Sequence, residues 1–155
     1  MNYKKSILLV VLIIMSFCLN SCDPPQFYHS GYTTEIINVE LIEYEADETK
    51  SSRELCNFDS ENSKSIDTLN ENDIEAFMTE ISELYIIMYY THPYSPDEKC
   101  IKISYSDDTF EIISQNRLVV LYDENGNVIE YVGMIDDIEK FISLVNKYFD
   151  NNITI

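Results

Sequence analysis

The chain has no tryptophan, only three glycines and only two histidines among its 155 residues. So few glycines leave little material for a loop that wraps a phosphate group, and the Walker, dinucleotide-binding and nucleophile-elbow motifs are absent. Lys and Arg number 10 against 28 acids, which argues against nucleic acid, because binding it needs a basic surface. The sequence therefore lacks the motifs that identify nucleotide-binding and nucleic-acid-binding proteins.

The two histidines, His29 and His92, have no serine, cysteine or carboxylate motif beside them. Catalysis or metal binding needs a second and a third group, which the sequence does not identify. The cysteines also lack the CxxC spacing of a zinc site. We therefore predict no catalytic residue, no metal site and no cofactor.

One long apolar run lies near the start of the chain. Lys4 and Lys5 precede it, and residues 7–15 are entirely apolar, which is typical of a secretory signal. A helix over residues 6–19 would be roughly 21 Å long, whereas the hydrocarbon core of a bilayer is about 30 Å thick. The pattern thus favours a cleaved signal over a permanent transmembrane helix.

The run ends in Leu19-Asn20-Ser21-Cys22. Leucine, then a small residue directly before a cysteine, resembles the lipobox of bacterial lipoproteins. The resemblance covers residues 1–22 and implies that residues 1–21 form a signal peptide and that the Cys22 thiol carries a diacylglycerol. It also implies a lipid-anchored protein of the bacterial cell membrane or outer membrane, facing the extracytoplasmic side. Plain secretion and an uncleaved anchor are the alternatives.

The rest of the chain divides into a tether at residues 22–33, led by two prolines, and a single acidic domain at residues 34–155. Residues 1–21 hold two lysines and no acids, so their removal would change the formal charge from −18 to −20. Such a charge keeps a folded body away from anionic lipid, whose surface attracts Lys and Arg. A solvated acidic surface explains this charge, and a basic partner or a loosely bound divalent cation is the alternative.

Cys56 and Cys100 are the two cysteines that follow Cys22. In an oxidising compartment, two leftover cysteines predict a disulfide. Closing the loop between them would stabilise the fold by about 4 kcal/mol in the chain-entropy description. Two unpaired thiols are the alternative.

Two segments have the apolar periodicity of amphipathic helices. In residues 71–85, apolar side chains recur at helical spacing, and Asn70 or Asn72 is placed to cap the first turn. A second helix is predicted at residues 137–149, with Asp136 as its N-cap and Glu139 completing a capping box.

Alternating apolar residues predict a strand at residues 34–44 and a meander of four further strands. The meander strands are Cys100–Tyr105, Phe110–Ser114, Leu118–Tyr122 and Val128–Gly133. Asn125-Gly126 marks the last hairpin. A short additional strand is expected at residues 55–58 or 66–69. These elements predict an α+β fold, an antiparallel sheet of about five strands with two amphipathic helices packed on one face.

Tyrosine is the residue type in excess, with twelve in the chain. Tyr85, Tyr89, Tyr90 and Tyr94 lie close together around the end of the first helix and a proline-containing loop. Tyrosine offers a rigid contact area with a polar tip, so Tyr90 and Tyr94 are the candidate ligand-binding residues. Half-burial of Tyr85 and Tyr89 in the core is the alternative.

Two acidic turns resemble cation sites only superficially. Residues 123–127 begin like a calcium loop, but Val128 and Met134 stand where such a loop needs glycine and a bidentate acid. Asp107-Asp108 is likewise interpreted as a turn, with weak cation trapping together with Asp123 as the alternative.

The sequence as a whole predicts a membrane-anchored extracytoplasmic lipoprotein whose domain is a non-catalytic binding or interaction module. Its partners would be the membrane, through Cys22, and a protein or envelope component, with no role for nucleic acid. A structural or assembly accessory of the cell envelope is one alternative. A hydrolase with carboxylates brought together from distant strands is the other.

Overall fold

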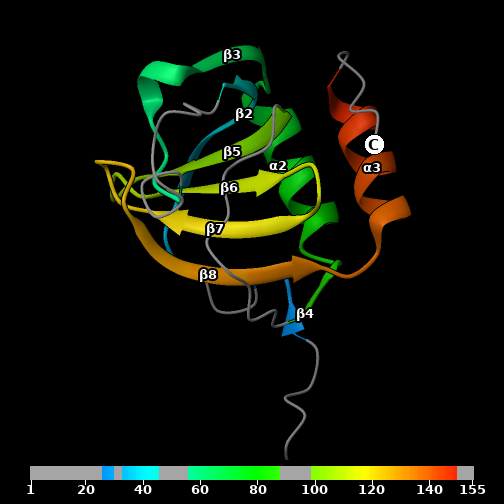
Figure 1. Cartoon of the computed structure of the whole chain (residues 1–155). Helices are drawn as coiled ribbons and strands as arrows, with labels where there is room; N and C mark the ends of the chain where they lie inside the picture. Colours follow the sequence, from blue (N-terminus) through cyan, green and yellow to red (C-terminus); the bar gives the residue numbers. More distant parts are fainter. Residues whose placement is uncertain (1–25, 30–32, 46–55, 88–98, 150–155) are drawn as a thin grey trace, which may run out of the picture.

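The computed structural model of the protein describes residues 26–29, 33–45, 56–87 and 99–149. In these residues eight strands form one sheet, and two α-helices pack against it (Figure 1). The strands are β1 (Gln26–Phe27), β2 (Ile36–Tyr44), β3 (Ser63–Thr68), β4 (Tyr85–Ile87), β5 (Lys99–Tyr105), β6 (Phe110–Ser114), β7 (Leu118–Tyr122) and β8 (Val128–Ile135). The helices are α2 (Glu71–Ile81) and α3 (Ile138–Tyr148), and a 3-10 turn, η1 (Ser60–Asn62), precedes β3.

The order of strands across the sheet is β1-β4-β8-β7-β6-β5-β2-β3, and all neighbours are antiparallel. Strands β5 to β8 form the predicted meander, because each one pairs with the next along the chain. Strands β2 and β3 extend the sheet on the β5 side, and β4 and β1 extend it on the β8 side. Figure 1 accordingly shows β3 at one edge of the sheet and β4, next to the outermost strand β1, toward the other.

The prediction of about five strands is wrong, because β1, β3 and β4 widen the sheet to eight. Strand β3 reads SKSIDT and has no fully buried residue. An edge strand is half solvated and needs little apolar pattern, so its sequence gives no strand signal. Strands β1 and β4 have two and three residues, which is too short for alternation to be visible. An additional strand was expected at residues 55–58 or 66–69, and β3 overlaps the second of these segments.

The larger core lies between the two helices and one face of the sheet. Helix α2 contributes Phe77 and Ile81, and α3 contributes Phe141 and Val145. The sheet supplies buried aliphatic side chains from six strands: Val39, Leu41, Ile86, Ile101, Ile103, Ile113, Val119 and Ile135. The removal of this apolar surface from water holds the helices on one face of the sheet.

Helix α2 begins as predicted and ends earlier than predicted. The Asn70 side-chain oxygen accepts hydrogen bonds from the amides of Asn72 and Asp73, and each bond is 3.1 Å long. This cap satisfies amide groups that the first helical turn leaves without a partner. The helix ends at Ile81, and the apolar residues that follow form β4 instead of a further turn.

Helix α3 is capped by Asp137 and not by Asp136. The Asp137 carboxylate accepts a 3.0 Å hydrogen bond from the Lys140 amide. The amide of Asp136 donates a 2.9 Å hydrogen bond to the Tyr85 carbonyl oxygen, so Asp136 continues the pairing of β8 with β4. Neither helix of the described part is long and apolar enough to cross a membrane.

A smaller core on the opposite face of the sheet contains a cluster of aromatic rings. Tyr44, Phe110 and Tyr122 come from the sheet, and Phe58 comes from the segment before η1. Phe58 stacks on Tyr44 with ring centroids 5.0 Å apart and meets Phe110 edge to face at 5.2 Å. The Phe58 amide also donates a 2.8 Å hydrogen bond to the Gly126 carbonyl oxygen. This segment therefore covers part of the face that lies away from the helices.

Residues 26–29, which the sequence assigned to the tether, pack against the domain. Strand β1 pairs with β4, and the Tyr28 amide donates a 2.7 Å hydrogen bond to the Leu84 carbonyl oxygen. The Tyr28 side chain is buried in the larger core. The sheet therefore begins only four residues after Cys22.

Candidate functional site

A groove of about 650 Å³ opens on the sheet face opposite the helices. It lies beside the β5–β6 turn and the β7–β8 hairpin, and Ile37 and Ser60 contribute from outside these two connections. Its polar lining includes Lys102, Thr109 and Asn125. A ligand in this groove would meet hydroxyl, amide and charged groups above a floor of aromatic rings.

Lys102 supplies a positive charge to the lining of the groove. Its Nζ atom lies 5.0 Å from the ring centroid of Phe110, 6.0 Å from that of Phe58 and 3.6 Å from Oε1 of Glu40. A cation above an aromatic face is attracted by the ring quadrupole, so these rings and Glu40 together fix the ammonium group. The Lys102 side chain is 24% exposed, which leaves it accessible to an anionic or hydrogen-bonding ligand.

One acid in each of the two neighbouring turns is hydrogen-bonded within its own turn. Asp107 accepts hydrogen bonds from the hydroxyl and the amide of Thr109, at 2.7 and 3.2 Å, and these bonds lower the pKa of its carboxyl group. Asp123 accepts bonds from the Asn127 side chain and from the amides of Asn127 and Asn125, which lower its pKa in the same way. Residues 106–109 and 123–127 thus form turns, as predicted. Within the described ranges, no three His, Cys, Asp or Glu residues are grouped to hold a metal ion.

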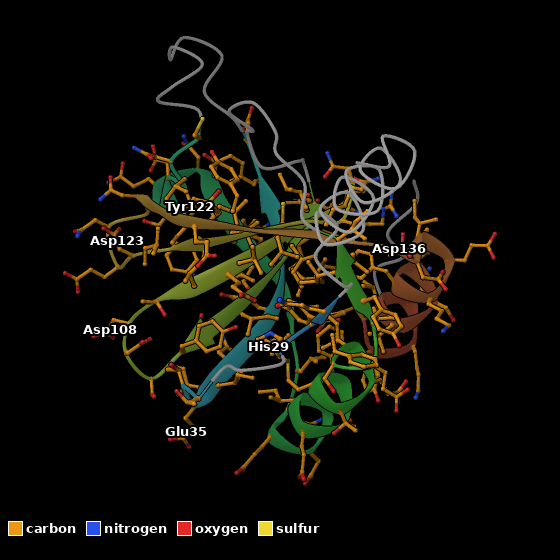
Figure 2. The ribbon with its side chains drawn as sticks, turned by 90° about the horizontal axis from the view of Figure 1, so that it is seen from below. His29, Glu35, Asp108, Tyr122, Asp123 and Asp136 are labelled. Atoms are coloured by element: carbon orange, nitrogen blue, oxygen red, sulfur yellow. The ribbon has the colours of Figure 1, made fainter. Side chains whose placement is uncertain are left out.

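The most enclosed polar cluster is centred on Glu111, on the helix side of the sheet. The Glu111 side chain is 0% exposed, and its carboxylate accepts a hydrogen bond from the Tyr28 hydroxyl. Nε2 of His29 lies 3.4 Å from Oε2 of Glu111 and 3.4 Å from the Tyr105 hydroxyl. Figure 2 shows His29 in the middle of the molecule, beside the strands. A carboxylate is costly to bury unless it is hydrogen-bonded or paired, and these partners compensate for that cost.

This cluster contains the groups that acid–base chemistry uses, but it is enclosed, and its role is to stabilise the fold. Glu111 has no exposed surface, and Tyr28 and Tyr105 are each 1% exposed. A substrate cannot contact an enclosed carboxylate in this conformation. The cluster joins the segment at Tyr28 and His29 to the middle of the sheet.

Cys56 and Cys100 are both buried, and no disulfide joins them in the structure, contrary to the prediction. Cys100 belongs to the smaller core, where a buried cysteine packs as a small apolar residue. Both thiols lie near Tyr122. Burial is the main reason that the pKa of the Tyr122 phenol lies far above its usual value. Electrostatic interaction with Tyr131 and Cys100 raises this pKa further.

The remaining predicted site residues are placed as follows. Cys22, Tyr90, Tyr94 and His92 lie outside the described residues. Tyr85 is 44% exposed and its ring stacks on that of Phe27, at a centroid distance of 4.2 Å. The core alternative for Tyr85 is therefore wrong, and the exposed ring belongs to a surface pair.

Sequence reasoning missed both the groove and the Glu111 cluster. Lys102 and Glu111 each stand in a strand with no neighbouring functional residue, so no motif marks them. A polar residue in the middle of an otherwise buried strand was the available signal: β6 reads FEIIS and all five of its residues are buried. A buried charge in such a strand requires partners, which a periodicity argument cannot name.

Comparisons with known proteins give no further identification. The chain matches no protein family, and neither curated proteins nor solved structures show significant similarity to it.

Proposed function

We propose that the protein is a membrane-anchored lipoprotein on the extracytoplasmic side of a bacterial membrane, with a domain that binds a protein or another envelope component without catalysis. The lipobox-like sequence that ends in Cys22 supports the anchor. The observation that carries the binding role is the groove in which Lys102 is held over aromatic rings. Such a groove combines a fixed charge with hydrogen-bonding groups, as small binding sites do.

A binding role is favoured over hydrolysis because of where the acids lie. Glu111, which has His29 and two phenols around it, is enclosed. Two other acids, Asp108 and Glu124, line the groove, but both are exposed on separate turns. A hydrolase would need a general acid that is both enclosed, so that its carboxyl group stays protonated, and in contact with the substrate.

The anchor is tested by Cys22→Ser in cells. Each buried CH₂ of an acyl chain contributes about 0.8 kcal/mol, so loss of the chains should release the protein or leave it unprocessed. Membrane fractionation together with mass spectrometry of the N-terminal peptide measures both. Fully processed Cys22→Ser protein that stays with the membrane would contradict the anchor.

The binding role is tested by photocrosslinking in cells that carry the anchored protein. A photoreactive amino acid is placed at Asn125, on the groove, and in a matched control at Glu139, exposed on α3. We expect a discrete adduct from Asn125 and not from Glu139. Lys102→Gln should reduce that adduct, whereas Lys140→Gln, which removes a charge from α3, should not.

The same experiment separates binding from a purely structural role in the envelope. A spacer or assembly accessory depends on tethering and bulk charge, so its adducts would be equal at both positions and insensitive to Lys102→Gln. The absence of any adduct at Asn125 in repeated experiments would count against a binding module at the groove.

A further inference from the structure

The described residues have four exposed large hydrophobic side chains, and two of them form a pair. Phe27 on β1 is 47% exposed and Tyr85 on β4 is 44% exposed. Their rings are stacked, with centroids 4.2 Å apart and planes inclined by 28°. The other two, Ile37 and Ile129, lie singly on β2 and β8. We call the Phe27 and Tyr85 rings the aromatic pair.

The aromatic pair lies close along the chain to the proposed anchor. Gln26, the first residue of β1, is the fourth residue after Cys22, and four steps of fully extended chain span at most about 14 Å. Lipidated Cys22 would therefore confine this edge of the sheet to the surface of its own membrane. The rest of the domain extends away from it across seven further strands.

The direction of the pair is fixed by the segment that follows it. Tyr28 is buried, its amide is bonded to the Leu84 carbonyl oxygen over 2.7 Å, and its hydroxyl donates to Glu111. Phe27 is thus held between β4 and a residue locked into the core. A rigid connection therefore holds Phe27 directly beside Gln26, the described residue nearest to Cys22 in the sequence.

We propose that the aromatic pair docks on the lipid surface that holds the Cys22 anchor, at the boundary between headgroups and acyl chains. Aromatic rings favour this boundary, and the phenol of Tyr85 suits it because one end of the side chain is apolar and the other polar. The anchor supplies a high local concentration, so a weak preference of two rings is sufficient. The contact sets the orientation of the domain, with the β1–β4 edge down and the β7–β8 hairpin away from the membrane.

This proposal rests on the anchor proposed above, and the absence of tryptophan provides a direct test. Phe27→Trp gives full-length lipidated protein with a single tryptophan, which is reconstituted into phosphatidylcholine vesicles with or without bromine on the acyl chains. Phosphatidylcholine is used because exposed Glu83 and Asp136 lie beside the pair and would be repelled by anionic lipid. Tyr85→Trp is the second reporter.

The matched control is Ile129→Trp, an exposed apolar position on β8 near the hairpin. Strand β8 pairs with β4 at Met134 and Ile135, so Ile129 lies about 20 Å along the strand from the pair. Asp123 marks the hairpin, and Asp136 marks the end of β8 that pairs with β4. Figure 2 shows these two residues on opposite sides of the molecule.

We expect roughly twofold lower emission in brominated vesicles for both pair reporters, since interfacial side chains reach about 5–10 Å into this boundary, and no change for Ile129→Trp. Acylated protein that floats with the vesicles but shows no quenching would overturn the docking and leave the anchor intact. Equal quenching at Ile129 would also overturn it, as would a blue shift seen only in native membranes, which would indicate a protein partner. Protein without acyl chains would refute the anchor and the docking together.

Discussion

The hydroxyl of Tyr28 donates a hydrogen bond to the carboxylate of Glu111, a residue 83 positions further along the chain. This bond connects the segment next to the proposed anchor with a central strand of the sheet. It also satisfies a carboxylate that has no contact with water. One hydrogen bond therefore serves two purposes, since it fixes the N-terminal edge strand and makes the burial of Glu111 tolerable.

Tyr28→Phe should lower the free energy of unfolding by about 1–3 kcal/mol, because the buried carboxylate loses a donor while the ring still fills its space. Chemical denaturation measures the change. The control is Tyr85→Phe, which removes an exposed hydroxyl and should have an effect within about 0.5 kcal/mol. A Tyr28→Phe effect no larger than the control would show that the bond does not stabilise the fold.

Gly126→Ala should destabilise the protein by about 1–3 kcal/mol. Gly126 has φ of +78°, and a Cβ atom there would lie 1.9 Å from the carbonyl oxygen of Phe58. Either the hairpin or the segment that carries Phe58 would have to move. Asn125→Ala in the same hairpin is the control, with an expected change below about 0.5 kcal/mol. Equal unfolding midpoints for the two variants would contradict the close contact.

Glu80→Gln should lower the melting temperature at neutral pH slightly, because Glu80 on α2 accepts hydrogen bonds from Lys147 and Tyr148 on α3. The bond from Lys147 is the main cause of the lowered pKa of Glu80 and of the raised pKa of Lys147. The stabilisation is therefore complete between the usual values, about 4.3 for Glu and 10.4 for Lys. It is lost as the pH falls through the lowered pKa of Glu80 or rises through the raised pKa of Lys147.

Thermal melts of the wild type and Glu80→Gln over a pH series test this window. The difference between the two proteins should vanish in acid, where Glu80 is protonated. Glu75→Gln, at an exposed position on the same helix, should show a smaller difference at neutral pH. A difference between wild type and Glu80→Gln that persists unchanged in strong acid would mean that the charge of Glu80 is not its source.

Tyr122 should stay protonated in the folded protein throughout the pH range in which ordinary tyrosines ionise, around pH 10. Burial beside Tyr131 and Cys100 disfavours the phenolate. Tyr122→Phe should therefore leave the alkaline absorbance titration of the native protein unchanged. In denaturant the same variant should show one ionising tyrosine fewer than the wild type. A reduced native amplitude would place Tyr122 in contact with solvent.

Several elements could be predicted because their signals are local. The alternation in β5 to β8, the Asn125-Gly126 turn and the apolar stripe around Phe77 all depend on residues near each other in the sequence. The N-cap of α3 shows the limit of such reasoning. Asp136 and Asp137 are equally suitable in sequence, and the bond between the Asp136 amide and Tyr85 in β4 decides between them.

The sequence on its own determined the lipobox-like Cys22, the acidic charge, the two amphipathic helices and the meander, because each is a property of neighbouring residues. Only the tertiary structure decided that β1, β3 and β4 complete the sheet, because strands this short or this polar are selected by the neighbouring strand that pairs with their backbone. It alone brought Lys102 over Phe110 and Phe27 over Tyr85. Contacts of that kind depend on which strands lie side by side and on which face each side chain points, and no local pattern records either.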